Sequence, residues 1–478
     1  MTTKNWFAIF AAAAAVVAAM PSSTAESLTS AAEKPRTKAV FFFDTEDFIQ
    51  PRSADAIRDI ANILHDEGVR GQFAMIGYLG KKLVDWRRFD VLDALKHHLI
   101  GTQTLYHSLH PNITESTDVE DYARAREHAL DEESRAIGML EAATGAERMW
   151  CSVLPGNGNT IVALYLYADL GIPFFGGGTG MYEDVTKCGD VWYCNQRHLN
   201  YAYNLHLESF LPGAKARDVD HELDVLSRQK VVTFYMHPHM AVCRQHWDFC
   251  FKGGNRHEFG KWPFAEARDA QDTATYYSRL RDFVHRLKDD PRFEVTDCER
   301  LFAEQRARRE ITLEDVSAIR ASLLARFGPV RSPGEWSIAD VYQAAVSFLR
   351  GEKSFMPDKA YGFLYEPNGV SKCTKVRAAD LKAAAGKLDL ATFVPNEIAV
   401  GGQKIGPADF LFAALETIET GAEEVVVEPR DQLGDISYYL PKMAALKSFA
   451  GTWIYAPEFK DEWTSRRLKW QFWTFRYE

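Results

Sequence analysis

Short apolar runs and amphipathic stretches alternate along the chain up to about residue 308. The run at 40–43 is four apolar residues long, which is typical of a buried parallel strand covered on both faces. A predicted helix begins at Ser53, places Ile57, Ile60 and Leu64 on one face, and ends at Gly68. Further strands are expected at 72–76, 150–154, 172–175 and 231–236, and further helices at 91–97, 119–143, 161–170 and 275–287. This alternation predicts an α/β domain with a mostly parallel sheet.

The pattern changes beyond residue 308. Residues 339–346 and 408–415 are similar amphipathic stretches, so we expect a duplicated helical unit, with chance similarity of two alanine-rich helices as the alternative. The aromatic stretch 469–477 is rich in strand-forming residues and predicts a strand or a docking tail. Five segments follow from these boundaries: a signal peptide at 1–25, a linker at 26–38, an α/β domain at 39–308, a helical repeat domain at 309–425 and a strand or tail segment at 426–478.

The N-terminus and the net charge narrow the class of protein. Lys4 precedes an apolar run at 6–20, and a small polar stretch then ends at Ala25, which is the pattern of a secretory signal peptide. The run is too short and too alanine-rich for a membrane span, so we expect a secreted or periplasmic mature protein without one. A net charge of -10 without any basic run argues against nucleic-acid binding.

Seven cysteines allow two local disulfides in an oxidising compartment. Cys188 and Cys194 are close in sequence, as are Cys243 and Cys250, whereas Cys151 lies in an apolar run and is expected to be a buried thiol. The spacings match no zinc finger, and the odd total leaves at least one cysteine unpaired.

Ionisable side chains follow three of the apolar runs. Three carboxylates lie within residues 44–47, His107 and His110 follow residues 100–102, and His237 follows the strand predicted at 231–236. Ligands and catalysis sit at the carboxyl ends of parallel strands, where carboxylates hold metals or act as bases and imidazoles act as ligands or acids. The structural alternatives are that Asp44 or Asp47 caps the next loop or helix, that the histidine pair is incidental, and that His237 bonds the backbone.

In order and spacing, these segments resemble the motifs of the polysaccharide deacetylase (NodB-homology) superfamily over roughly residues 38–308. The resemblance implies an α/β fold, a distorted (β/α) barrel of NodB type, to which a mainly helical C-terminal domain is added. It implies catalytic roles for Asp44 as the base and His237 as the acid. The metal-ligand positions of the family fall on Glu46, Gln103 and His107. Residues 153–158 are similar to the substrate-lining third motif, and the candidate substrate-binding residues are Pro155, Tyr106 and His239.

Two departures from the family concern the metal. Gln103 stands where the family has a histidine, and an amide oxygen is a weaker ligand than an imidazole nitrogen. Glu46 stands where many members have aspartate, which lengthens the arm by one methylene. Some relatives, the allantoinase-like cyclic amide hydrolases, have altered ligands and work without metal. His110 is an alternative ligand, unless residues 110–112 are turn chemistry.

The resemblance implies an exported hydrolase that removes acetyl groups from an amino-sugar polysaccharide, at an amide C–N or an ester bond. It implies assistance by a divalent metal, with zinc as the expected ion. Two alternatives stay open: a metal-independent amide hydrolase on the same fold, and a non-catalytic carbohydrate-binding protein with a decayed site. Residues 394–407 also resemble the pseudomurein-binding repeats of cell-wall proteins, which implies that the C-terminal half binds a cell-wall polymer. A purely structural helical appendage is the alternative for that half.

Overall fold

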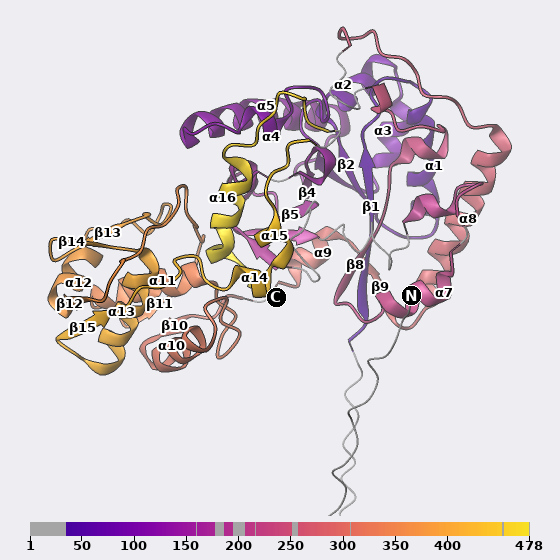
Figure 1. Cartoon of the computed structure of the whole chain (residues 1–478). Helices are drawn as coiled ribbons and strands as arrows, with labels where there is room; N and C mark the ends of the chain where they lie inside the picture. Colours follow the sequence, from indigo (N-terminus) through magenta and orange to yellow (C-terminus); the bar gives the residue numbers. More distant parts are fainter. Residues whose placement is uncertain are drawn as a thin grey trace, which may run out of the picture. The chain divides into compact units, whose positions relative to one another are not determined.

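A ten-stranded sheet forms the framework of the protein (Figure 1). The computed structural model describes residues 35–158, 160–176, 186–194, 206–215, 217–250, 257–305, 307–451 and 454–477. The signal peptide expected at 1–25 and most of the linker lie outside these residues. Nine strands follow one another across the sheet in the order β16-β6-β7-β5-β4-β3-β2-β1-β8, and β9 pairs with β1 beside that path. The strands are β1 (Thr37–Thr45), β2 (Gln72–Met75), β3 (Leu99–Thr102), β4 (Cys151–Val153), β5 (Phe174–Gly176), β6 (Thr186–Cys188), β7 (Val191–Cys194), β8 (Val231–Met236), β9 (Phe293–Thr296) and β16 (Arg476–Tyr477).

The predicted mixed α/β architecture with a mostly parallel sheet is confirmed. All pairings of β1 with β2, β8 and β9, and those of β2 through β5 with their neighbours, are parallel. Among the described strands of this sheet, the antiparallel pairings are those of β6 with β7 and with β16. Among the described strands no pairing joins β8 to β16, so the ladder is an open path and closure into a barrel stays a prediction.

The alternation of side chains along β1 decides which face carries the site. Phe41 and Phe43 point into the larger core, where Phe41 contacts Phe283 of helix α8 (Ala270–Asp289) with ring centroids 6.3 Å apart. Val40 and Phe42 point to the opposite face and pack in a smaller cluster that includes Tyr235 of β8. Because successive strand residues alternate between faces, Asp44 follows Phe42 on that second face.

Helices connect the strands of the sheet, and several of their ends follow the sequence signals. The helix predicted from Ser53 is α1, and the long helix predicted over 119–143 is α5, which ends at Gly145 in the left-handed conformation with φ 73°. The helices of this part are α1 (Ser53–Asp66), α2 (Gly77–Asp85), α3 (Phe89–Leu95), α4 (Ile113–Ser116), α5 (Tyr122–Thr144), α6 (Ile161–Asp169), α7 (Val219–Leu226), α8 (Ala270–Asp289) and α9 (Cys298–Ala303). No helix in the described ranges is both long and apolar enough to cross a membrane.

The C-terminal part contains helices and three short two-stranded ladders. Its two similar stretches form α11 and α13, and each helix has a buried aspartate in its first turn, Asp340 and Asp409. The helices are α10 (Val316–Ala325), α11 (Ile338–Leu349), α12 (Ala378–Ala385), α13 (Pro407–Thr420), α14 (Ile436–Tyr439), α15 (Pro441–Ala445) and α16 (Thr464–Trp470). The ladders pair β10 (Ile311–Thr312) with β11 (Ser354–Phe355), β12 (Thr374–Arg377) with β15 (Glu424–Val427), and β13 (Ile398–Val400) with β14 (Gln403–Ile405). The division into separate domains stays a prediction.

The last aromatic stretch forms more than the strand or tail that its composition predicts. It continues α16 as a 3-10 helix at Gln471–Thr474 and then adds β16 to the main sheet, antiparallel to β6. Phe472 and Trp473 are fully buried and Phe475 nearly so, so this segment belongs to the core.

The disulfides expected from cysteine spacing are not formed. Cys188, Cys243 and Cys250 have free thiols. The Cys243 sulfur accepts a hydrogen bond from Nε2 of Gln50 at 3.2 Å, and the Cys188 sulfur accepts one from the Thr474 hydroxyl at 3.5 Å. Proximity in sequence allows a disulfide but does not orient the two Cβ atoms as a disulfide requires.

Candidate active site

The site lies where β1 and β8 end side by side. The two strands are parallel and pair Phe42 with Tyr235 and Phe43 with Met236. Asp44 and His237 therefore follow neighbouring positions at the carboxyl edge of the sheet. Alternation places Tyr235 and His237 on one face of β8, so both side chains turn toward Asp44.

Tyr235 connects Asp44 to His237. Its hydroxyl donates to Oδ2 of Asp44 at 2.7 Å, and it lies 2.9 Å from Nε2 of His237, which donates to it when protonated. On the far side of the imidazole, Nδ1 of His237 lies 2.8 Å from Oε1 of Glu208, in the 3-10 helix Leu207–Phe210. One line of hydrogen bonds thus runs from the Glu208 carboxylate through His237 and Tyr235 to Asp44.

The pKa values of Asp44 and His237 are both raised above those of free side chains. Burial raises the pKa of Asp44 to about 7, and the charge of Glu46 adds to this, whereas His237 and the Tyr235 hydroxyl oppose it. Burial acts to lower the pKa of His237, but the carboxylates of Glu46 and Glu208 outweigh it and raise that pKa to about 10. Near neutral pH the pair therefore combines a carboxylate that accepts a proton with an imidazolium that donates one.

The second carboxylate oxygen of Asp44 accepts no hydrogen bond from the described residues. This oxygen, Oδ1, is buried. A buried acceptor without a partner costs about 1–3 kcal/mol, so native proteins fill such positions with water or a ligand. Oδ1 is therefore the place on this carboxylate where a reacting water can be held.

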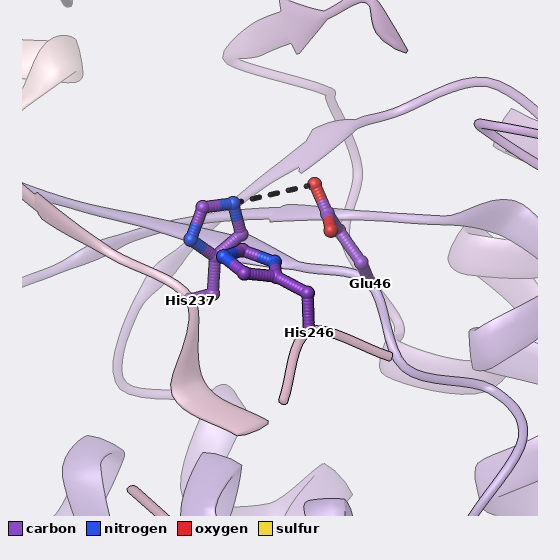
Figure 2. A group of neighbouring side chains, drawn as sticks. All are labelled: Glu46, His237 and His246. Carbon is purple, nitrogen blue, oxygen red and sulfur yellow. Dashed lines mark ion pairs between the residues drawn. The ribbon is translucent and has the colours of Figure 1, made fainter. Parts of the chain in front are cut away.

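Glu46 lies beside this pair and is held at both oxygens. Oε2 accepts the indole N–H of Trp247 at 2.5 Å, and Oε1 lies 3.1 Å from Nε2 of His107 and 3.8 Å from Nε2 of His237. Burial acts to raise the pKa of Glu46, but the charges of His107 and His237 hold that pKa well below its usual range. Figure 2 shows His246 beside the same carboxylate, and the nearest donor atoms of Glu46, His237 and His246 lie within 4.8 Å of one another.

The loop after β3 brings His107 to Glu46 through an unusual backbone path. Thr104 and His107 adopt left-handed conformations with φ 59° and 51°, and the Thr104 hydroxyl accepts the His107 amide at 3.1 Å. Non-glycine residues in this region cost on the order of 1 kcal/mol or more and gather at functional sites. Gly101 lets β3 approach β4, because a Cβ there would lie 2.2 Å from the sulfur of Cys151.

The metal-ligand set implied by the family resemblance does not fit these residues. Of that set, Glu46 and His107 are in contact, with Oε1 and Nε2 3.1 Å apart. Gln103 is completely buried after β3, and neither polar atom of its amide has a partner in the part of the chain that is described. No group of three acidic, histidine or cysteine ligands among those residues includes His107. Two donors with a neutral amide as the third are a weak site for a divalent ion.

Of the predicted substrate-binding residues, Tyr106 alone is partly exposed. Its ring belongs to an aromatic cluster with Tyr78 at 5.3 Å and Phe259 at 5.7 Å between ring centroids. His239 is buried, its Nε2 accepts the Trp247 amide at 3.3 Å, and burial, with the charges of His246 and His237, holds its pKa well below the usual range. Pro155 is buried, and the next residue, Gly156, packs directly against Ile454.

Asp47 and His110 have structural partners that agree with the alternatives weighed for them. Asp47 accepts the amides of Ile49 and Gln50 at 2.9 and 3.2 Å and the hydroxyl of Ser53 at 2.5 Å, so it organises the turn before α1. His110 places Nδ1 3.0 Å from both oxygens of Glu115, and its Nε2 is buried without a hydrogen-bond partner among the described residues.

Four residues of the site were not anticipated from the sequence: Tyr235, Glu208, His246 and Trp247. Tyr235 was read only as an apolar strand residue, although a tyrosine two positions before a strand-end histidine faces the same side and was a usable signal. Glu208 lies in a four-residue 3-10 helix and His246 in an irregular segment, and neither has a periodicity that predicts what it approaches.

Comparisons with known proteins add similar structures but no family. Neither a family model nor a curated protein matches the chain. A 4-alpha-glucanotransferase from Thermococcus litoralis is similar at 12% identity and TM-score 0.37, over 57% of this chain and 41% of its own length. PuuE allantoinase is similar at 12% identity and TM-score 0.36, over 57% and 93%. A Mycobacterium smegmatis protein described as a polysaccharide deacetylase is similar at 15% identity and TM-score 0.34, over 58% and 96%. Likenesses at this level assign neither a family nor a reaction to the chain.

Proposed function

We propose that the protein hydrolyses an acyl C–N or ester bond through Asp44 and His237, without a metal ion in the reaction. The observation that carries this proposal is the hydrogen-bonded line Glu208–His237–Tyr235–Asp44, which ends in an unpartnered, buried carboxylate oxygen. Of the three functions left open by the sequence, this arrangement supports the metal-independent hydrolase best. A decayed, purely binding site would have no need to hold an acid and a base on one continuous line.

Side chains of this protein accept and donate all the protons that the reaction moves. Asp44 accepts a proton from the attacking water as the new C–O bond forms, which leaves a tetrahedral intermediate with negative charge on oxygen. When the C–N bond breaks, Nε2 of His237 gives its proton to the departing nitrogen. Asp44 then holds one proton too many and His237 one too few, and a shift through the Tyr235 hydroxyl restores both.

The imidazolium groups supply the positive charge that the intermediate needs. Burial acts to lower the pKa of His107, but the Glu46 carboxylate 3.1 Å away outweighs it and raises that pKa, which favours the charged imidazole. The His237 side chain is 14% exposed, against 4% for Asp44 and 6% for His107. A substrate that enters from the His237 side meets the acid first and the water held by Asp44 behind it.

The choice of substrate rests on the four motifs that resemble polysaccharide deacetylases. We infer an acetylated amino sugar within a polymer as the substrate class, acetate as one product, and export through the signal-like N-terminus. Attachment to a cell-wall polymer through residues 309–425 is the corresponding proposal for the C-terminal part.

Acetate release tests the proposal. The mature chain, residues 26–478, is treated with a chelator and incubated with acetylated chitosan oligomers, an O-acetylated polysaccharide and 4-nitrophenyl acetate. We expect hydrolysis of at least one acetylated sugar, and a loss of about two to four orders of magnitude in kcat for Asp44→Asn. Full activity of Asp44→Asn, or activity of the wild type only after metal is restored, would overturn the mechanism.

A further inference from the structure

We propose that Glu46, His237 and His246 bind a divalent transition-metal ion of the Zn²⁺ type, and that the ion blocks hydrolysis by occupying Nε2 of His237. Binding of the ion is argued from geometry alone, whereas inhibition of hydrolysis by the ion rests on the proposed function. This set differs from the one that the family resemblance implies, because it shares only Glu46 with it.

The spacing of the three donors suits one ion. Oε1 of Glu46 and Nε2 of His237 are 3.8 Å apart, and the donor atoms of the three residues lie within 4.8 Å of one another (Figure 2). Two ligands of a tetrahedral zinc ion, each about 2.1 Å from the metal, lie roughly 3.4 Å apart. Side-chain adjustments of less than about 1 Å would therefore bring all three donors onto one ion. A carboxylate with two imidazoles is also a donor set that zinc uses in proteins.

The surrounding groups orient the donors as metal sites require. Glu208 holds Nδ1 of His237 at 2.8 Å, which directs Nε2 toward Glu46, and a carboxylate behind a histidine is the usual support of a metal-bound imidazole. Trp247 holds Oε2 of Glu46, and Oε1 lies 3.8 Å from Nε2 of His237 and 3.1 Å from Nε2 of His107. The ring centroids of His237 and His246 are 4.4 Å apart with the planes at 80°, so the rings meet edge to face.

Occupation of this site and proton donation by His237 exclude each other. Nε2 of a neutral imidazole has one lone pair, and the same atom carries the proton that the leaving group receives. A bound ion therefore leaves the Glu208–His237 pair in place but removes the acid. We expect hydrolysis to decrease in proportion to the fraction of molecules that hold the ion.

Zinc titration of the chelator-treated mature chain tests both halves. Elemental analysis after desalting should give one zinc per chain, and acetate release should fall as zinc is added. His246→Ala should weaken zinc binding at least about tenfold, as expected from the loss of one of three ligands, and should relieve the inhibition by the same factor when each protein is compared with its own zinc-free rate. Gln103→Ala serves as the matched control in the position that the family uses, and should leave zinc binding unchanged.

Three results would overturn the proposal: no zinc bound by the wild type, equal zinc binding by His246→Ala, or faster hydrolysis with zinc than without it. The zinc content does not depend on the reaction. If no acetylated substrate is hydrolysed under any condition, the proposed function fails, while the stoichiometry and its loss in His246→Ala still decide the site.

Discussion

Two clusters of carboxylates in this protein differ in how fully they are hydrogen-bonded. The catalytic cluster comprises Asp44, Glu46, Tyr235, His237 and Glu208. The second, here called the C-terminal clamp, comprises Asn112, Glu115 and Asp118 together with the backbone of residues 454–464 that they bind. Its contacts join α4 and the loop after it to the segment that leads into α16.

Every carboxylate of the C-terminal clamp is saturated with donors. Glu115 accepts the amides of Asn112 at 2.8 Å and Ala456 at 2.5 Å, and His110 lies 3.0 Å away. Asp118 accepts the amides of residues 462, 463 and 464 at 2.7–2.8 Å and so caps α16, whose N-cap residue Trp463 makes no side-chain cap bond of its own.

Asp44 differs from Glu115 in the number of its donors, and this reverses the shift of its pKa. Both carboxyl groups lose water on burial, which raises their pKa values. In Glu115 the bonds from His110, Ala456 and Asn112 overcome that effect and lower the pKa. In Asp44 one hydroxyl and the nearby histidines do not overcome it, and the pKa stays raised. We infer that the Glu115 carboxylate, with its acceptor positions filled, stabilises the fold, whereas Asp44, with one oxygen unfilled, takes part in the reaction.

Removal of the Glu115 carboxyl group should give the largest effect, on stability. Glu115→Ala leaves two buried amides and an imidazole without their acceptor, so we expect a loss of about 2–4 kcal/mol in the free energy of unfolding. Urea denaturation measures this, with exposed Glu120→Ala as the matched control. Acetate release per folded molecule should stay near the wild-type value. A variant as stable as the wild type would show that the clamp does not stabilise the fold.

Removal of the Tyr235 hydroxyl should have the next largest effect, on rate. Tyr235→Phe keeps the ring in the cluster with Val40 and Phe42 but cuts the line between Asp44 and His237. A hydrogen bond to a charged group contributes about 1.5–3 kcal/mol, so kcat should fall about ten- to a hundredfold. Steady-state acetate release checks this. An unchanged kcat would exclude Tyr235 from the proton path.

Glu133 offers a smaller, pH-dependent effect on stability, away from both clusters. Its carboxyl group accepts the hydroxyls of Tyr167 at 2.6 Å and Thr102 at 2.9 Å, yet burial, with the charge of Glu132, raises its pKa to about 8. The folded state therefore keeps a proton that the unfolded state loses above a pKa of about 4.3. Stability attributable to this group is present below that value and is lost as pH rises toward 8, by on the order of 1 kcal/mol per pH unit.

Glu133→Gln isolates this effect because the amide does not titrate. Compared with the wild type, its urea midpoint should be similar at pH 5 and relatively higher at pH 8. Parallel midpoints of the two proteins across this range would contradict the raised pKa.

The sequence predicts the site residues whose positions follow from strand periodicity, but few of the residues that are placed by long-range contacts. Asp44, Glu46, His107 and His237 are found from sequence because each follows an apolar run that forms a strand of the same sheet. Glu208, in a short 3-10 helix, and His246, in an irregular segment, are placed only by the completed fold. The clamp was missed for the same reason: Asp118 and residues 462–464 are far apart in sequence and meet only through the packing of the C-terminal segment.

The metal ligands show the same limit. The motif order suggested Gln103 as a ligand position, but the sequence does not reveal that the Gln103 amide bonds neither Glu46 nor His107. Nor does it reveal that His246, distant in sequence, approaches Glu46.

The stability of Asp44→Asn tests the central claim most directly. If Asp44 is kept unsaturated for chemistry, removing its buried charge should lower acetate release by orders of magnitude and leave the urea midpoint equal to or above that of the wild type. A loss of about 2 kcal/mol or more in the free energy of unfolding, of the size expected for a saturated carboxylate, would contradict the account. It would place Asp44 in the same structural class as Glu115.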